Sequence, residues 1–150
     1  MTSKRKKIQK VLELREQALE KRAGALVQSR TKLQHAVDEA ERESQRLLLA
    51  AEHRATLTNA VTDVGSWLDA EQWLAHRRNV LGRATGKVVS AEAVVAEDFK
   101  RVVAARIDKK KLEILDGRMA EEQLRAELRT EQKLSDEFGQ RRRASERGDD

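Results

Sequence analysis

Residues 12–51, LELREQALEKRAGALVQSRTKLQHAVDEAERESQRLLLAA, decide the fold of this chain. Aliphatic residues return at every seventh position, and Ala23, Val37 and Ala51 lie four residues beyond members of that row. The row consists of Leu12, Leu19, Leu26, Leu33, Ala40 and Leu47. A one-sided apolar row of this period is typical of a coiled-coil helix. Because a single helix with so narrow an apolar side is marginal in water, we expect a partner helix.

The composition points the same way. The 150 residues include no Pro, Cys or Tyr, 3% are aromatic and 38% are charged. Such a chain lacks the turn residues and aromatic filling of a compact α/β enzyme and fits long helices. The missing cysteines exclude disulfides and thiolate zinc sites. The net charge of +5 comes from interspersed charges, which indicates a mixed surface.

The pattern divides the chain into two long helices. We expect a first helix over residues 4–61, a tip segment over 62–86 and a second helix over 87–143. The two long stretches match in length, which predicts an all-α antiparallel two-helix coiled-coil hairpin with a short helical segment near the tip. Residues 1–144 then form one hairpin with both termini at one end, and 145–150 form a disordered tail.

Two glycine-containing segments mark the breaks. Gly65 can end a helix, and Ser66-Trp-Leu-Asp69 is typical of a capping box that opens the next one. Gly82-Arg-Ala-Thr-Gly86 predicts a second junction, although a helix can run through it. The alternative is one helix over 67–143 that overhangs its partner. The sequence leaves both arrangements open.

No catalytic, metal-binding or cofactor-binding site is predicted. Gly82 to Lys87 lacks the spacing and the Ser or Thr of a phosphate loop. His35 and His53 lie about 27 Å apart on one helix, too far to share a metal. The longest apolar run, 47–51, is far too short to span a membrane. We therefore expect a cytoplasmic protein that is not an enzyme and has no small-molecule substrate.

The tryptophans are the most informative side chains. Trp67 and Trp73 are six residues apart, which places them about 120° out of phase on a helix. Both cannot point into one narrow seam, so at least one should be exposed. Local packing at the tip and an exposed anchor for a partner are equally open interpretations. We choose Trp73 as the exposed residue, because Leu74, Val80 and Leu81 could extend its patch.

The chain resembles the FliJ and YscO-like stalk proteins of type III export. The run Ile8-Gln-Lys-Val-Leu-Glu-Leu-Arg15 is similar to the family's opening, and Trp67-Leu-Asp-Ala-Glu-Gln-Trp-Leu74 to its middle segment. Arg106-Ile-Asp-Lys-Lys-Lys-Leu-Glu-Ile-Leu115 resembles its basic stretch, and 126–138 its closing motif. The motifs occur in the family's order over nearly the whole chain.

The resemblance implies a non-enzymatic stalk that stimulates the export ATPase ring. It also implies contacts with the cytoplasmic domain of the export-gate protein and with substrate chaperones, and association with the membrane only through those partners. For the gate, the implied residues are Trp67, Trp73, Leu74 and Val80. For the ATPase they are Lys109, Lys110, Lys111, Glu131, Gln132, Lys133, Asp136, Glu137 and Phe138. The resemblance does not separate a flagellar system from an injectisome.

Two other classes of function remain open. The chain could be a homodimeric coiled-coil scaffold, which its mass in solution would reveal. It could also be a basic nucleic-acid-binding rod, because basic clusters occur at 4–7, 109–111 and 141–143. Nucleic-acid modules combine such clusters with aromatic platforms or a recognition fold, and neither accompanies them here. A solvated surface or a protein contact is therefore favoured for these clusters.

Overall fold

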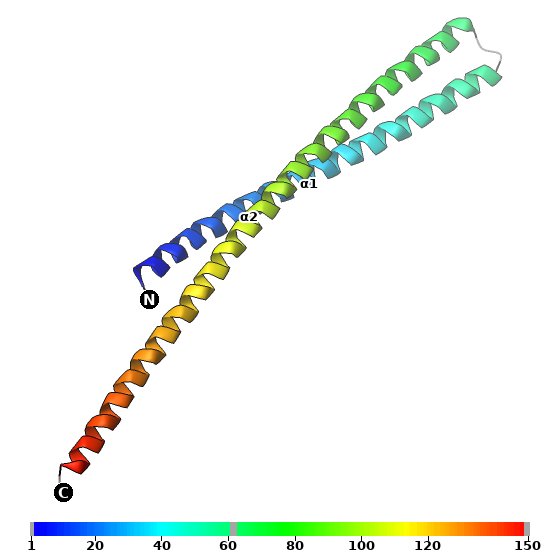
Figure 1. Cartoon of the computed structure of the whole chain (residues 1–150). Helices are drawn as coiled ribbons and strands as arrows, with labels where there is room; N and C mark the ends of the chain where they lie inside the picture. The colour runs from blue at the N-terminus through cyan, green and yellow to red at the C-terminus, as the bar shows by residue number, and fades with distance from the viewer. Residues whose placement is uncertain (1, 61–62, 149–150) are drawn as a thin grey trace. The chain divides into compact units, whose positions relative to one another are not determined.

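The computed structural model describes residues 2–60 and 63–148. These residues form two α-helices, α1 (Ser3–Asn59) and α2 (Val64–Arg147), of 57 and 84 residues (Figure 1). The described residues include no strand, and none of their helices is long and apolar enough to cross a membrane. The predicted all-α class is confirmed.

The chain divides into two compact units, each built from a piece of both helices. The first unit comprises Met1–Leu19 and Ala105–Asp150, and the second comprises Glu20–Ala104. Each unit is therefore a pair of helical segments, one from α1 and one from α2. The ion pairs that join the two segments show how each pair is oriented.

The second unit is an antiparallel pair. Glu39 of α1 lies 3.6 Å from Lys87 of α2, and farther along α1 Arg54 lies 2.5 Å from Glu71. As the residue number rises on α1, it falls on α2. The two segments thus run in opposite directions, as a hairpin requires.

The first unit is antiparallel as well. Arg5 Nε donates a hydrogen bond to Asp116 Oδ1 over 3.0 Å, and Arg15 lies 3.9 Å from Asp108. The Arg5–Asp116 pair is mostly buried, whereas the Arg15–Asp108 pair is half exposed. Exposed pairs contribute little to stability, so the apolar contacts beside them hold these helices together.

The seam of α1 contains the apolar row predicted from the sequence. None of the row members from Leu12 to Leu47 is exposed, and Leu26 is buried. From Leu26 onward, however, three of the buried companions lie three rather than four residues beyond the row. Ser29 is buried instead of Arg30, Glu43 instead of Ser44, and Ala50 instead of Ala51. These three residues keep the sevenfold spacing of the row, so this part of the seam follows alternating steps of three and four residues, as in a coiled coil.

The seam of α2 keeps alternating steps of four and three residues over most of its length. Every member of this row is buried or half-buried. The row consists of Ala70, Leu74, Arg77, Leu81, Ala84, Val88, Ala91, Val95, Asp98, Val102, Ala105, Lys109, Leu112, Asp116, Met119 and Gln123. This is a heptad pattern with small and charged residues among the aliphatic ones. Such a mixture explains why the sequence pattern of α2 looks less regular than that of α1.

Asp63 caps the start of α2, three residues before the predicted capping box. Its Oδ1 accepts a hydrogen bond from the Ser66 backbone N–H over 2.6 Å. This is the geometry of an N-cap carboxylate, which satisfies a donor that the first helical turn leaves open. The hydrogen bonds from the Ser66 backbone and hydroxyl hold the pKa of Asp63 below its usual value. Residues 61 and 62 of the predicted break lie outside the described residues.

The second predicted break is absent. Gly82 and Gly86 both lie inside α2, and no described glycine has a positive φ. Each glycine costs about 1 kcal/mol relative to alanine in a helix interior. That cost is small against the seam contacts of Leu81, Ala84 and Val88 on the same turns. Residues 64–86 therefore form one helix with the rest of α2, which corresponds to the overhanging alternative.

In the first unit, α2 extends well past the start of α1. The pair of Arg5 with Asp116 places the first turns of α1 beside Asp116, and α2 continues to Arg147. The prediction that the two helices end at one level is wrong, because α2 begins at Val64 rather than after a separate tip segment. Residues 145–147 of the predicted tail are helical, and 149–150 lie outside the described residues.

Candidate partner-binding surfaces

Trp67 packs locally at the start of α2. Its side chain is half-buried, and its Nε1 donates a hydrogen bond to Thr58 Oγ1 of α1 over 3.2 Å. The Arg54 guanidinium lies 5.6 Å from the ring centroid, within range of a cation–π interaction. These contacts join the two helices of the second unit. The structure therefore gives Trp67 the local packing role.

Trp73 is the exposed tryptophan. Its side chain is 49% exposed, and the His76 ring lies 5.6 Å away. The Arg77 guanidinium lies 4.4 Å from the centroid of the Trp73 ring. A large aromatic surface with a cation on one face is a frequent anchor at protein interfaces.

A buried carboxylate holds Arg77 in place. Glu43 of α1 is only 6% exposed, and its two oxygens accept hydrogen bonds from two arginines. Arg77 donates over 3.2 Å from α2, and Arg46 donates over 2.6 Å from α1 itself. A buried carboxylate is tolerated only with such partners. Glu43 thus links the seam to the exposed ring of Trp73 through Arg77.

The other residues predicted beside Trp73 do not extend its exposed patch. Leu74 is 2% exposed and packs in the seam, and Val80 and Leu81 are half-buried. The helical period explains this, because Leu74 is about 100° away from Trp73 around the helix axis. Of the predicted gate-binding residues, Trp73 is the one with a large free surface.

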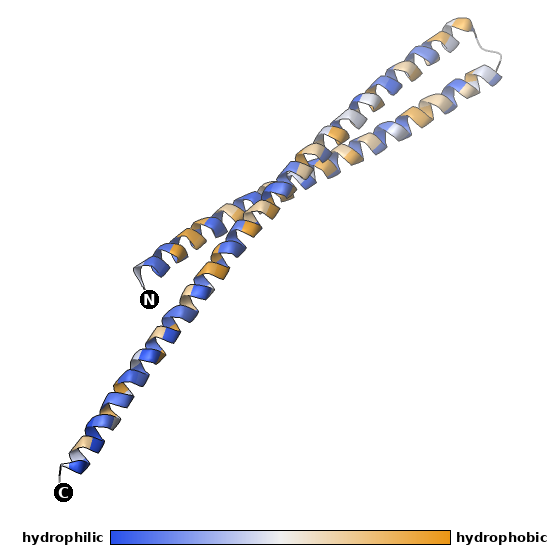
Figure 2. Ribbon diagram, viewed as in Figure 1, coloured by the Kyte–Doolittle hydropathy of each residue, from blue (hydrophilic) through white to orange (hydrophobic). Residues whose placement is uncertain are grey.

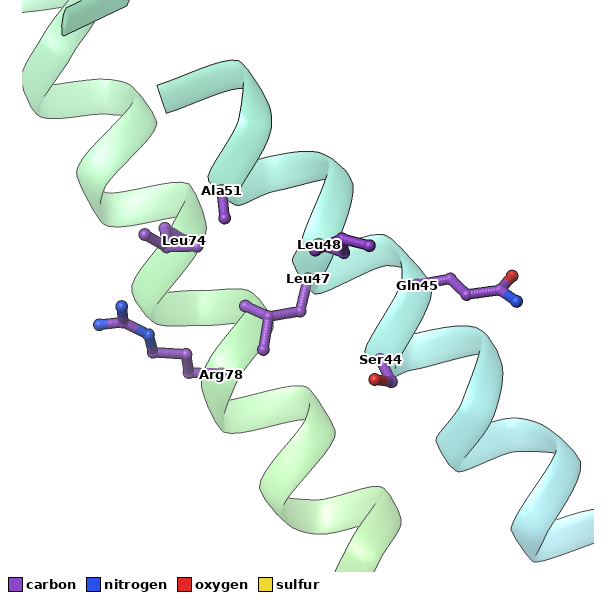
Figure 3. Close-up of a pocket in the computed structure, with 7 residues that line it drawn as sticks. All are labelled: Ser44, Gln45, Leu47, Leu48, Ala51, Leu74 and Arg78. Atoms are coloured by element: carbon purple, nitrogen blue, oxygen red, sulfur yellow. The ribbon is translucent and has the colours of Figure 1, made fainter. Parts of the chain in front are cut away.

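A shallow groove opens beside the seam of the second unit. Its volume is about 370 Å³, and Figure 3 shows Leu47 pointing from α1 toward α2 while Arg78 points away from α1. Leu48, 61% exposed, forms part of its wall. The groove is lined by Ser44, Gln45, Leu47, Leu48, Ala51, Leu74 and Arg78. This surface was not predicted, although the run of aliphatic residues at 47–51 exceeds what one seam can cover.

The basic cluster at 109–111 is divided between the seam and solvent. Lys109 Nζ lies 3.5 Å from Glu16 Oε1 and 3.8 Å from Glu113 Oε1, so its charge is already paired. Lys110 and Lys111 are exposed, and Lys110 lies 3.8 Å from Glu113 Oε2. Lys111 makes no ion pair with any described residue.

The carboxyl-terminal part of α2 has no helix beside it in its unit. All residues from Leu124 to Gly148, which we call the overhang, are exposed. In Figure 2 this end of α2 is mostly hydrophilic, with separate hydrophobic turns. The exposed fractions of the large apolar side chains are 56% for Leu124, 54% for Leu128, 51% for Leu134 and 66% for Phe138.

These four side chains form a row of their own. On an α-helix they fall within an arc of about 120°. If the seam row continued past Gln123, it would pass through Ala126, Thr130 and Lys133, which are small or polar. Leu124 instead lies one residue beyond the row, about 100° around the helix. The overhang therefore presents an apolar row that the α1 seam does not share.

The predicted ATPase-binding residues of the closing motif all lie on the overhang. Each is exposed. They are Glu131, Gln132, Lys133, Asp136, Glu137 and Phe138. The structure brings Phe138 together with Leu124, Leu128 and Leu134, which the sequence analysis did not combine into one surface. Their common helical arc is the signal that could have identified them.

The histidines do not gather. His35, His53 and His76 are all exposed, and the two described segments contain no group of three or more histidines and carboxylates able to hold a metal ion.

Comparison with known proteins identifies the family of this chain. The family model described as flagellar FliJ protein matches residues 4–148, nearly the whole chain. No curated protein and no solved structure gives a significant match. The family is a flagellar one and serves protein export without a catalytic role of its own. The chain belongs to the FliJ family of flagellar export proteins.

Proposed function

We propose that this chain is the stalk of a flagellar export ATPase complex and raises the activity of the ATPase without hydrolysing ATP itself. The observation that carries this proposal is the apolar row of the overhang. Four large side chains, each more than half exposed, lie on the stretch of α2 that has no helix beside it in its unit. Family membership supports the export setting.

The overhang is the surface we assign to the ATPase. A single helix in water gains little stability from its own hydrogen bonds, so burying its apolar side in a partner stabilises it. Truncating a large anchor residue at such an interface typically costs more than about 2 kcal/mol of binding. Among the residues implied by the resemblance, Lys109 is already paired with Glu16, so the overhang takes the main role.

We assign the export-gate contact to Trp73. Its support is the half-exposed ring, held in one orientation by Arg77 and through it by Glu43. A side chain that is ordered before binding loses less conformational entropy on binding. Substrate chaperones complete the proposed partners, and we assign them no surface. The proposed location is the cytoplasmic face of the export apparatus.

Phosphate release by the partner ATPase tests the stalk role. The assay compares the ATPase alone, this chain alone and the mixture. We expect no hydrolysis by the chain alone and faster hydrolysis in the mixture. Leu128→Glu combined with Phe138→Glu should abolish the increase, because two charges then lie in the apolar row.

Ala126→Glu is the matched control. Ala126 lies on the same exposed helix, about 200° around from Leu124. This variant should stimulate as well as the unchanged protein. Hydrolysis by the chain alone, or no stimulation by the unchanged chain, would contradict the stalk role. Equal loss in both variants would place the ATPase contact elsewhere on the overhang.

A further inference from the structure

Two carboxylates lie inside the apolar row of the overhang. Measured around the helix axis from Leu124, the row runs from about −80° at Leu134 to about +40° at Leu128. Glu127 falls at about −60° and Glu131 at about −20°, so both lie within this arc. Both glutamates are exposed. Any partner that covers the apolar row therefore also covers two negative charges.

The chain supplies no counter-charge for these two glutamates. No basic residue stands three or four positions from either of them, where a helix brings side chains together. Arg125, Arg129 and Lys133 lie at least about 60° outside the arc. Arg125 is also paired with Glu121 over 3.8 Å. Among residues 2–60 and 63–148, neither glutamate of the arc makes an ion pair.

Both glutamates line a shallow hollow beside the apolar row. Its volume is about 360 Å³, and its other lining residues are Gln123, Ala126 and Thr130. Gln123 Nε2 donates a hydrogen bond to Glu127 Oε1 over 3.1 Å. The Thr130 hydroxyl donates to the Ala126 carbonyl over 2.9 Å. None of the lining side chains is basic, so the hollow offers carboxylate oxygens and no cation.

The chemistry of the partner surface follows from these two charges. Like charges four residues apart on a helix repel each other and destabilise it. Burying them against a partner adds a desolvation cost unless cations face them. A purely apolar groove would suit the leucines but leave both carboxylates buried without a partner. A basic side chain between the carboxylates removes both costs, and an arginine can hydrogen-bond to a carboxylate through two N–H groups.

We propose that the surface of the export ATPase that binds the overhang is an apolar groove with at least one arginine or lysine facing Glu127 and Glu131. This inference rests on the proposed function and adds the chemistry of the partner surface to it. The leucines and Phe138 supply most of the contact area. The two carboxylates select the groove and fix the register of the helix in it, because charges at an interface contribute specificity more than affinity.

Calorimetric titration of the full-length chain into the export ATPase, at low and high salt concentration, tests this inference. Glu127→Gln combined with Glu131→Gln removes both charges and nearly preserves the shape of the side chains. We expect the affinity to fall at least about tenfold, because the facing cation is then buried without its partner. The affinity of the unchanged chain should decrease as the salt concentration rises, and that of the double variant should depend less on salt.

Glu127→Lys and Glu122→Lys form a matched pair of variants. Both reverse the charge of an exposed glutamate on the same helix, but Glu122 lies about 160° around the helix from Leu124, outside the arc. Glu127→Lys should lower the affinity at least about tenfold, because it opposes two cations across the interface. Glu122→Lys should change the affinity less than about threefold, because salt screens a charge outside the interface. Circular dichroism melting confirms that each variant folds.

Equal loss of affinity in the two lysine variants, or an unchanged affinity in the glutamine variant, would overturn the basic groove. The stalk role would stand in either case, because the unchanged chain still binds. No binding by the unchanged chain would overturn both proposals. Sedimentation of the chain alone tests the remaining occupant. A dimer that Glu127→Lys dissociates would assign the facing cation to a second copy of the chain, whose Arg142 lies within the same arc, and would overturn the assignment to the ATPase.

Discussion

The guanidinium of Arg77 lies 4.4 Å from the centroid of the Trp73 ring while it donates a hydrogen bond to the buried Glu43 of the other helix. A residue inside the helix pair thereby orients a residue on its surface. Because Trp73 and Arg77 are four residues apart, one turn of α2 carries both groups. Glu43 determines where the cation lies, and the cation covers one face of the ring.

Trp73→Ala should weaken binding of the export-gate cytoplasmic domain and leave the melting temperature nearly unchanged. The ring is half exposed, so its removal leaves no cavity in the seam. An anchor of this kind typically contributes more than about 2 kcal/mol to binding. Calorimetric titration and circular dichroism melting measure the two effects. Trp67→Ala is the control and should lower the melting temperature, because Trp67 joins the helices through Thr58. A sharp fall in melting temperature for Trp73→Ala with unchanged binding would make Trp73 a packing residue.

Glu43→Leu should lower the free energy of unfolding by about 3 kcal/mol, since it leaves the largely buried Arg77 without its carboxylate. Adding Arg77→Leu to this variant should recover most of that loss. Urea denaturation of the single and double variants measures both values. Lys87→Ala, which breaks the exposed pair with Glu39, should change the stability by less than about 1 kcal/mol. If Glu43→Leu changed the free energy of unfolding as little as Lys87→Ala, the buried Glu43 carboxylate would not be what holds Arg77 in place.

Asp63 should titrate below the usual carboxylate pKa of about 3.9, because its charged form accepts the hydrogen bonds of Ser66. A lowered pKa in the folded state means that this carboxylate stabilises the fold above about pH 4. The contribution is lost as the pH falls through the lower folded value. Carboxyl carbon chemical shifts in an NMR titration give the pKa directly. Ser66→Pro removes the backbone N–H in the first helical turn and should raise it. An unchanged pKa in that variant would argue against the cap.

Gly82→Ala and Gly86→Ala should each stabilise the protein by about 0.5–1 kcal/mol. Both glycines lie in α2 with ordinary helical backbone, and an added Cβ meets no atom within 4 Å. Alanine reduces the freedom of the unfolded chain without strain in the folded one. Thermal melting of the single and combined variants tests this expectation. A loss of stability would mean that this segment needs glycine, as a break in the helix would.

The sequence predicted that two helices pair better than it predicted where each helix begins and ends. The apolar row from Leu12 to Leu47 was enough to predict α1, because it recurs at every seventh residue without a break. It misplaced several companions by one residue, because the seam continues three rather than four residues beyond the row and so contains Glu43 rather than Ser44. The break at Gly82–Gly86 was overestimated, because flanking seam contacts outweigh two glycine penalties.

The candidate surfaces were predictable only in part. The phase difference between Trp67 and Trp73 correctly indicated that one of them is exposed. It could not place Arg77 between the ring and Glu43, because that depends on which residues of two distant segments lie at one level. For the same reason, the sequence could not decide whether α2 overhangs α1. The apolar row of the overhang became apparent only when the Arg5–Asp116 pair showed where α1 begins beside α2.

Hydrogen exchange along the overhang tests the central claim most directly. The backbone amides of residues 124–147 are measured in the free chain and with the partner ATPase present. The account predicts fast exchange in the free chain, because no helix covers this segment in its unit, and strong protection in the complex. The seam segment around Leu26 should be protected in both states. Fast exchange of residues 124–147 in an ATPase-saturated sample would contradict the claim that the overhang binds the ATPase.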